Sequence, residues 1–161
     1  MNDLITIKIS EANQSDWPSF LLEAYANKNQ FCLVVEPERK LCDKCDYLYY
    51  SKEKLHFHSS ELGAMCFEFA EIYEYHRRQN YALSKEPLAR ALAIKGNEKK
   101  LIWDTTCGSG KDSLLIHYFG AILTSFERNP AIYLLLKDAL QRFPLDIDLV
   151  FADASKDCLL Y

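Results

Sequence analysis

The chain has 161 residues, 49% hydrophobic and 26% charged, which is typical of a globular protein and not of a disordered one. Its formal net charge of −4 excludes a general attraction to nucleic acid, and no apolar stretch has the length of a membrane span. Because no signal-peptide pattern opens the chain, we expect a cytoplasmic protein without a membrane partner. Its six cysteines should then be reduced and mostly buried.

Residues 1–80 predict a small α+β module. A helix is expected at residues 15–29, with Ser15 as its N-cap, Pro18 in its first turn and apolar residues spaced three and four apart. The remaining elements expected here are strands at residues 31–38, 46–51 and 54–58, the first broken at Pro37, and a segment at 64–81 that is ambiguous at its start and helical at its end.

A second helix is expected at residues 84–96. Ser84 would be its N-cap, Pro87 lies in the first turn, and Gly96 would close it. A polar link follows. We therefore expect an N-terminal module over residues 1–80, a helix and linker over 81–100, and a second domain over 101–161.

From residue 101 the pattern becomes strand, glycine loop, helix, strand, helix, strand, as in parallel βαβ units. The first strand, "LIWD", is short and apolar, and we expect it to be buried. The expected elements are strands at residues 101–104, 121–127 and 146–155, with a helix at 111–120 whose core face is Leu114, Leu115 and Tyr118.

An acidic residue stands at or just after the carboxyl end of each strand in this region: Asp104, Glu127 and Asp153. Ligands of open parallel sheets bind at that edge, where glycines let the backbone approach them. The loop "TTCGSGKD" lacks the third glycine of a dinucleotide site, and Asp104 would repel a pyrophosphate but attract a cation. The pattern therefore favours S-adenosylmethionine over NAD, the alternative being a tight turn without a ligand.

The role of each acid follows from its chemistry. Glu127 would bond the ribose hydroxyls, and Asp153 would accept a hydrogen bond from the adenine amino group. A local excess of positive charge suggests a kind of binding partner. Residues 76–100 contain seven basic residues and two acidic ones. Such a patch suits a phosphate backbone or, equally, a solvated helix face.

Three segments together resemble a known family: "DTTCGSGKDSLL", "SFERNPAIYLLLKDAL" and "HRRQNYALSKEPLARALAIKG". They are similar to the 16S (small-subunit) ribosomal RNA guanine-N2 methyltransferase J family, which belongs to the class I S-adenosylmethionine-dependent methyltransferases. The resemblance spans about residues 31–155. It implies an α/β fold with a Rossmann-like sheet, S-adenosylmethionine as cofactor, small-subunit ribosomal RNA as partner, and methylation of the N2 amine of a guanine.

Site residues follow from matching the family's motifs to this chain. With the resemblance we expect RNA contacts at Arg77, Arg78 and Lys85, the alternative for His76, Arg77 and Arg78 being that they cap the C-terminus of their helix. Two departures are "YALSK", where the family has a glycine-rich run, and Asp153-Ala154, where it often has serines. The cofactor contacts implied by the motifs and by the strand pattern together are Asp104, Gly108, Gly110, Lys111, Asp112, Glu127, Arg128, Asp153 and Ala154.

The family continues into a fourth strand with a D-P-M-F-P motif that positions the acceptor amine, and this sequence stops at Tyr161 without it. We therefore expect a truncated member that binds cofactor weakly and does not turn over, and we assign no catalytic residue. Without a fourth strand beside it, "LIWD" would be an exposed apolar edge and a site of self-association. The competing hypothesis is a non-catalytic RNA-binding or assembly module with a vestigial cofactor fold. A dinucleotide-dependent oxidoreductase is a third.

Two cysteine patterns suggest other chemistry. Cys42 and Cys45, with His56 and His58, have elements of a zinc site, but a structural hairpin is favoured because no second CxxC exists, and we expect no metal. Cys107 lies in the glycine loop, and a small loop side chain is favoured there over a nucleophile.

Overall fold

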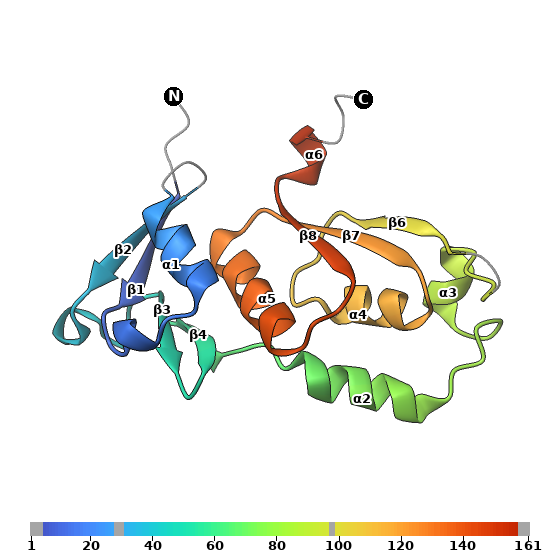
Figure 1. Ribbon diagram of the computed structural model, residues 1–161, viewed down its shortest axis with the longest axis horizontal. Coiled ribbons are helices and arrows are strands. Elements are labelled where there is room, and N and C mark those ends of the chain that lie inside the picture. Colours follow the sequence, from blue (N-terminus) through green and yellow to red (C-terminus); the bar gives the residue numbers. More distant parts are fainter. Residues whose placement is uncertain (1–4, 28–30, 97–98, 158–161) are drawn as a thin grey trace. The chain divides into compact units, whose positions relative to one another are not determined.

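The computed structural model describes residues 5–27, 31–96 and 99–157 (Figure 1). The chain divides into two compact units. The first comprises Met1–Phe67 and Pro130–Asp138, and the second comprises Glu68–Asn129 and Ala139–Tyr161. These units differ from the expected division near residues 80–100. Because they are defined by proximity and not by independent folding, the division into domains 1–80, 81–100 and 101–161 stays a prediction.

The first unit is built on a five-stranded mixed sheet. Its strands follow the order β2-β1-β3-β4-β5, in which β1 is parallel to β2 and β3, and β4 is antiparallel to β3 and β5. The strands expected at residues 31–38, 46–51 and 54–58 are thereby confirmed. The elements of this unit are β1 (Thr6–Ser10), η1 (Gln14–Asp16), α1 (Ser19–Ala26), β2 (Cys32–Glu36), η2 (Glu38–Lys40), β3 (Tyr47–Ser51), β4 (Lys54–Ser59) and β5 (Gly63–Met65).

Helix α1 starts later than its sequence pattern suggested, and Ser15 is not its N-cap. Ser15 lies in the 3₁₀ turn η1, and Pro18 is the N-cap of α1. The reason is local, because a proline disfavours helical geometry in the residue before it, and Trp17 is accordingly extended at φ −61° and ψ 132°. Residues 28–29, the end of the expected helix, lie outside the described residues.

The second unit contains a three-stranded parallel sheet in the order β6-β7-β8. This arrangement confirms the predicted α/β fold with three successive parallel strands (Figure 1). Each strand pair is joined through a helix, as parallel strands require. The elements of this unit are α2 (Phe69–Gln79), α3 (Pro87–Ala91), β6 (Leu101–Asp104), α4 (Lys111–Tyr118), β7 (Ile122–Glu127), β8 (Ile147–Phe151) and α6 (Ala154–Asp157), and helix α5 (Pro130–Arg142) is divided between the two units.

One face of this sheet packs on helices. Of the core positions expected on α4, Leu114 is fully buried, while Leu115 and Tyr118 are half-buried against the core cluster. The buried members of that cluster are Ala89, Ile94, Ile116, Phe119, Ala121 and Leu123.

Helix α3 is shorter than the helix expected at residues 84–96. Its N-cap is Glu86 and not Ser84, with Pro87 at the first helical position. The helix closes at Ala93, which has a left-handed φ of 52°, and the Ile94 N–H donates to the Ala89 carbonyl at 2.8 Å. This closure directs Ile94 into the core, where it is 5% exposed. Burial of Ile94 thus ends the helix before Gly96.

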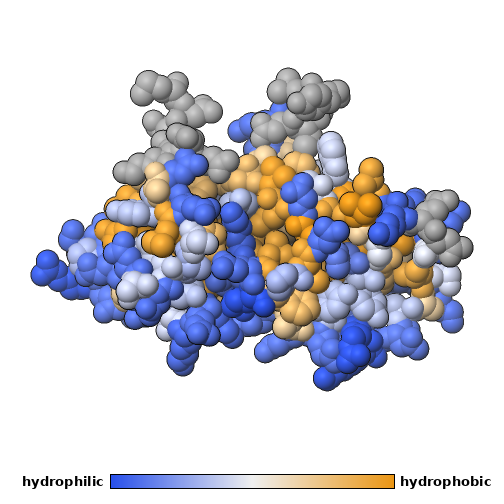
Figure 2. All heavy atoms as spheres, viewed as in Figure 1, coloured by the Kyte–Doolittle hydropathy of each residue, from blue (hydrophilic) through white to orange (hydrophobic). Residues whose placement is uncertain are grey.

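The expected burial of "LIWD" is wrong. Leu101 and Trp103 on β6 are 77% and 59% exposed, and the neighbouring Ile122 of β7 is 43% exposed. Figure 2 shows apolar residues gathered on the surface over this strand. As predicted for a strand without a further neighbour, β6 is an edge of its sheet. Within the described residues, none of the helices is both long and apolar enough to cross a bilayer.

Candidate functional site

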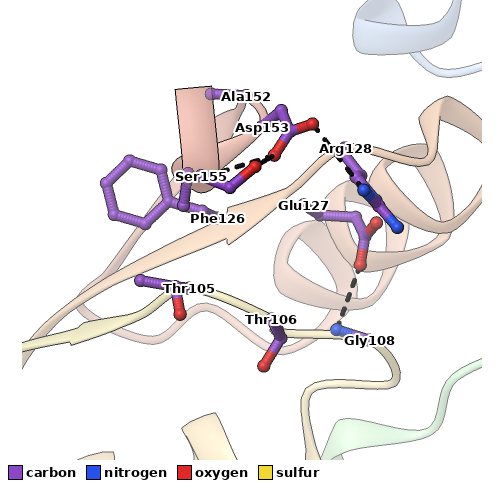
Figure 3. Close-up of a pocket in the computed structure, with 10 residues that line it drawn as sticks. Thr105, Thr106, Gly108, Phe126, Glu127, Arg128, Ala152, Asp153 and Ser155 are labelled. Atoms are coloured by element: carbon purple, nitrogen blue, oxygen red, sulfur yellow. Dashed lines mark hydrogen bonds and ion pairs between the residues drawn. The ribbon is translucent and has the colours of Figure 1, made fainter. Parts of the chain in front are cut away.

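The loops that follow β6, β7 and β8 surround one cavity of about 620 Å³. Because the three strands are parallel, their carboxyl ends lie at the same edge of the sheet, and the lining residues come from these ends, from the loops after them and from the start of α6 (Figure 3). The volume is within the range of pockets that hold a nucleoside-sized ligand. The lining residues are Thr105, Thr106, Gly108, Phe126, Glu127, Arg128, Ala152, Asp153, Ala154 and Ser155.

Glu127 is the acid at the carboxyl end of β7, and its side chain is only 9% exposed. One carboxylate oxygen accepts from the Gly108 N–H at 3.0 Å and the other from the Asn129 N–H at 2.7 Å. The two bonds fix the carboxylate at the wall of the cavity, and Figure 3 shows the one from Gly108. Since each oxygen has a second lone pair, Glu127 can still accept hydrogen bonds from ligand hydroxyls.

The glycine loop after β6 owes its shape to two left-handed residues. Gly108 has φ 54° and Gly110 has φ 77°, a region that side chains disfavour, and Gly110 is the N-cap of α4. The Cys107 N–H donates to the Phe126 carbonyl at 3.1 Å, which ties the loop to β7. The backbone of Gly108 is thereby presented to the cavity without an intervening side chain.

Asp104 ends β6, as the sequence pattern suggested, and its assignment as a cofactor contact stays a prediction. Its carboxylate accepts from the Ser113 hydroxyl on α4 and, at 3.2 Å, from the Thr106 N–H. Ser113 is 2% exposed and also accepts a hydrogen bond from Ser125 of β7 at 3.1 Å. Asp104 is thus bound to the glycine loop and helix α4, and it is not among the residues that line the cavity.

Asp153 lies on the cavity wall after β8. Its carboxylate accepts from the Ser155 hydroxyl at 2.6 Å and from the Ser155 N–H at 3.2 Å, with Lys156 and Arg128 nitrogens 3.6 Å and 3.7 Å away. These partners, the Ser155 hydroxyl above all, hold the pKa of Asp153 below its usual range. The side chain is therefore an acceptor at neutral pH.

The cavity brings together some of the sequence-predicted cofactor contacts and not others. Gly108, Glu127, Arg128, Asp153 and Ala154 line it, and Asp104, Gly110, Lys111 and Asp112 do not. Sequence reasoning did not name Thr105, Thr106, Phe126, Ala152 and Ser155. A signal for them was present in the sequence, because each lies within two positions of a predicted contact that follows or ends a strand, where the chain must pass the same edge.

Lys111 and Asp112 line a different hollow of about 360 Å³ between α4 and α2. Its other walls include Tyr75 and His76, whose rings meet edge to face at 5.5 Å. His76 is 9% exposed and is bonded to the Tyr81 hydroxyl at 2.9 Å, and burial lowers the pKa of the imidazole. The first turn of α4 therefore faces α2, and the assignment of Lys111 and Asp112 as cofactor contacts stays a prediction.

The predicted RNA contacts are at or after the end of α2. The Nε and Nη2 atoms of Arg77 donate hydrogen bonds to the Glu74 carboxylate at 2.7 Å and 2.8 Å. The Nε atom of Arg78 donates to the same carboxylate at 3.0 Å. These bonds hold the pKa of Glu74 down to about 2, so the three side chains carry one net positive charge at neutral pH. Lys85 is exposed in the turn before α3.

The described cysteines are less buried than expected. Cys107 is buried in the glycine loop, where burial raises the pKa of its thiol to about 11, so it is not an activated nucleophile. Cys42 is exposed, Cys32, Cys45 and Cys66 are intermediate, and Cys158 lies outside the described residues. In the part of the chain that the structure describes, no three His, Cys, Asp or Glu side chains are grouped as a metal ion requires.

Comparison with protein families identifies the family of the chain. The family described as putative SAM-dependent methyltransferase matches residues 26–157. The chain belongs to this family. S-adenosylmethionine is therefore the cofactor of the family, which confirms the resemblance in the sequence and the choice of this cofactor over NAD.

Curated relatives of the chain carry the name of the family that its motifs resemble. The chain is 31% identical over 147 residues to the ribosomal RNA small subunit methyltransferase J of Laribacter hongkongensis, covering 86% of this chain and 50% of that protein. It is 30% identical over 137 residues to the protein of the same name from Aeromonas salmonicida, covering 85% and 46%. The chain thus spans about half the length of the curated relatives it matches.

A solved structure supports the fold. The crystal structure of a SAM-dependent methyltransferase from Neisseria gonorrhoeae superposes with a TM-score of 0.64 at 23% identity, over 96% of this chain and 64% of that one. This likeness confirms the predicted Rossmann-like methyltransferase fold.

The residues present fit an adenosyl ligand. A ribose and an adenine amino group are hydrogen-bond donors, and the cavity offers them two fixed carboxylates, Glu127 and Asp153. Gly108 lines the cavity without a side chain, which allows the ligand to approach the backbone closely. Arg128 and Lys156 form ion pairs with Asp153, and both cationic side chains are largely exposed.

Proposed function

We propose that this chain binds S-adenosylmethionine in the cavity at the ends of β6, β7 and β8, and that it forms the cofactor-binding part of a methyltransferase acting on small-subunit ribosomal RNA. The acceptor we propose is the N2 amine of a guanine. The observation that carries this proposal is the convergence of Glu127, Asp153 and the Gly108 backbone on one cavity.

Within this proposal, the chain's own residues bind and orient. Glu127 accepts from the ribose hydroxyls, and Asp153 accepts from the adenine amino group. When bound, S-adenosylmethionine supplies an electrophilic methyl group. Since the two carboxylates are already held by backbone and side-chain donors, little ordering cost falls on them when the ligand binds.

Calorimetry with S-adenosylhomocysteine tests the cofactor site. We expect binding to the chain, and a large loss of affinity in Glu127→Gln and in Asp153→Asn. Asp148→Asn is the matched control, because Asp148 is an exposed acid of β8 outside the cavity. Circular dichroism spectra identify any variant that fails to fold. If Glu127→Gln and Asp153→Asn bind S-adenosylhomocysteine as tightly as Asp148→Asn and the parent chain do, the site is refuted. A chain that binds RNA but not the cofactor would favour the vestigial module.

We further propose that RNA contacts the basic side chains at the C-terminal end of α2, and that the protein works where ribosomal RNA is made, in the cytoplasm. Arg77 and Arg78 are 66% and 75% exposed beyond the carboxylate they share, and Lys85 follows nearby in the chain. Guanidinium groups suit phosphate because their fork matches its oxygens.

Salt-dependent binding to small-subunit rRNA tests this surface. For the triple variant Arg77→Ala/Arg78→Ala/Lys85→Ala we expect weaker binding and a smaller slope of log affinity against log salt, by about one for each phosphate that the variant no longer neutralises. Arg39→Ala is the control, an exposed arginine of η2 in the other unit. Identical slopes for the triple variant and the parent chain would exclude this surface.

Finally, we propose that the chain self-associates through β6. An edge strand offers unpaired backbone groups, and β6 adds two exposed apolar side chains, Leu101 and Trp103. Ile122 beside Leu101 extends the apolar surface onto β7. Sedimentation velocity of the parent chain and of Leu101→Lys tests this association.

A further inference from the structure

Cys42 and Cys45 lie together in the turn between η2 and β3, in the unit that does not contain the cofactor cavity. The Cys45 N–H donates to the Cys42 carbonyl at 2.9 Å, which closes a four-residue turn, and the two Sγ atoms are 3.3 Å apart. A turn of this kind holds its first and last Cα atoms within about 7 Å. A disulfide spans Cα separations of about 4.4–6.8 Å, so the pair can close without moving the strands.

The surroundings of Cys42 favour reaction at its sulfur. The side chain is exposed, and hydrogen bonds from the Cys45 thiol and then from the Lys44 N–H lower the pKa of the Cys42 thiol. Burial and the charge of Asp43 oppose these bonds without overcoming them. At neutral pH a larger share of Cys42 is therefore thiolate than in a free cysteine.

The groups that face the turn come from the β3–β4 hairpin. The Nε2 atom of His58 is 3.4 Å from the Asp43 carbonyl, and Tyr47 stacks on the His58 ring at 4.9 Å. Asp46, which follows the turn, accepts hydrogen bonds from the N–H and the hydroxyl of Ser60, at 2.7 Å and 2.8 Å. Among the described residues no further sulfur or imidazole joins the two thiols as a metal set. The surroundings thus leave the two sulfurs free to react with each other.

We propose that Cys42 and Cys45 form a reversible disulfide by exchange with a low-molecular-weight disulfide, with Cys42 as the attacking thiol and Cys45 as the resolving one. The Cys42 thiolate attacks one sulfur of glutathione disulfide, forms a mixed disulfide and releases one glutathione. The Cys45 thiolate then attacks the Cys42 sulfur and releases the second glutathione. The chain loses two electrons and two protons, and one glutathione disulfide is reduced to two thiols.

The closed disulfide would tie the turn beside Tyr47 and His58 into one rigid conformation. Reduction would release it. The pair is therefore a redox-responsive element of the β3–β4 region, and its chemistry is independent of the methyl-transfer function proposed above.

The test uses the whole chain, reduced and then equilibrated in glutathione buffers of graded redox potential. Free thiols are alkylated and the peptides are weighed by mass spectrometry. We expect an intramolecular Cys42–Cys45 disulfide whose fraction follows a two-electron dependence on potential. Cys45→Ser should accumulate the mixed disulfide on Cys42, whereas Cys42→Ser should form adducts at Cys45 severalfold more slowly.

Cys32→Ser is the matched control and should leave the Cys42–Cys45 disulfide unchanged. Three outcomes would overturn the proposal: Cys42 alkylated no faster than Cys32, oxidation that joins separate chains and not Cys42 to Cys45, or one equivalent of zinc retained by the purified chain and lost in Cys42→Ser. Cys107 serves as an internal reference, because its buried thiol should stay unmodified in every buffer.

Discussion

The two sheets of the molecule contain similar apolar strands in opposite situations. In the first unit β3 lies between β1 and β4, and Leu48 on β3 is fully buried. In the second unit β6 is an edge strand, and Leu101 is 77% exposed. Both residues are leucines in short apolar strands. The difference shows that burial is a property of a strand's neighbours and of what covers its faces.

The same contrast applies to function. The outer face of β6 remains available for association, while the carboxyl ends of β6, β7 and β8 already form a cavity with fixed acceptors. The proposed ligand site is lined by the ends of these three strands and by the segments that follow them.

The largest expected effect concerns the buried leucine. Leu48→Ala should lower the free energy of unfolding by about 2–5 kcal/mol, since it opens a cavity in a packed core. Leu101→Ala should change it by less than about 0.5 kcal/mol. Urea unfolding followed by circular dichroism measures both. Equal losses would mean that β6 is covered in solution.

A smaller effect is expected at the loop anchor. Asp104→Ala removes the acceptor of the Ser113 hydroxyl and the Thr106 N–H, and it should cost about 1–3 kcal/mol of unfolding free energy. Asp148→Ala, at an exposed acid of β8, should cost almost nothing. If the two variants unfold at the same urea concentration, Asp104 does not hold the loop.

Association should respond at the β6 edge without a comparable change in stability. In Leu101→Lys we expect a shift toward monomer in sedimentation velocity, because a charge on an edge strand opposes pairing. Leu62→Lys is the matched control, since Leu62 is a leucine of the first unit that is 78% exposed. A parent chain that is monomeric at every concentration would remove the proposal of self-association.

The smallest effect is expected in acid. The folded-state pKa of Glu74 is depressed to about 2 by hydrogen bonds from Arg77 and then Arg78, so its contribution to stability is complete above the usual carboxyl pKa of 4.5. It is lost as pH falls from about 4.5 to about 2. Glu74→Gln should flatten the stability profile in that window only. An NMR titration in which the Glu74 carboxyl group has its midpoint near pH 4.5 would contradict its pairing with Arg77 and Arg78.

Local sequence patterns anticipated most of the strands, the glycine loop and the acids at the strand ends. They were less successful at helix limits. Helix α3 ends at Ala91 because Ile94 turns into the core, and α1 starts at Ser19 because Pro18 holds Trp17 extended. The second cause is local and could have been foreseen. The first depends on a packing partner that no local pattern contains.

For the site, the sequence placed Glu127 and Asp153 at one edge because parallel strands leave no alternative. It could not tell that Asp104 would bond Ser113, or that Lys111 and Asp112 would face α2. Side-chain direction in a tight loop depends on backbone angles such as the left-handed φ of Gly108 and Gly110. Those angles are decided when the loop packs against β7.

The sequence by itself determined the class of the fold and the acceptors that suit an adenosyl ligand, since these depend on periodicity, on glycine and on residue chemistry along the chain. It also indicated the family, through the resemblance of its motifs. Only the tertiary structure decided which residues line the cavity, that β6 is exposed, and that Cys42 and Cys45 are in contact while Cys107 is buried. These properties depend on neighbours brought together by folding.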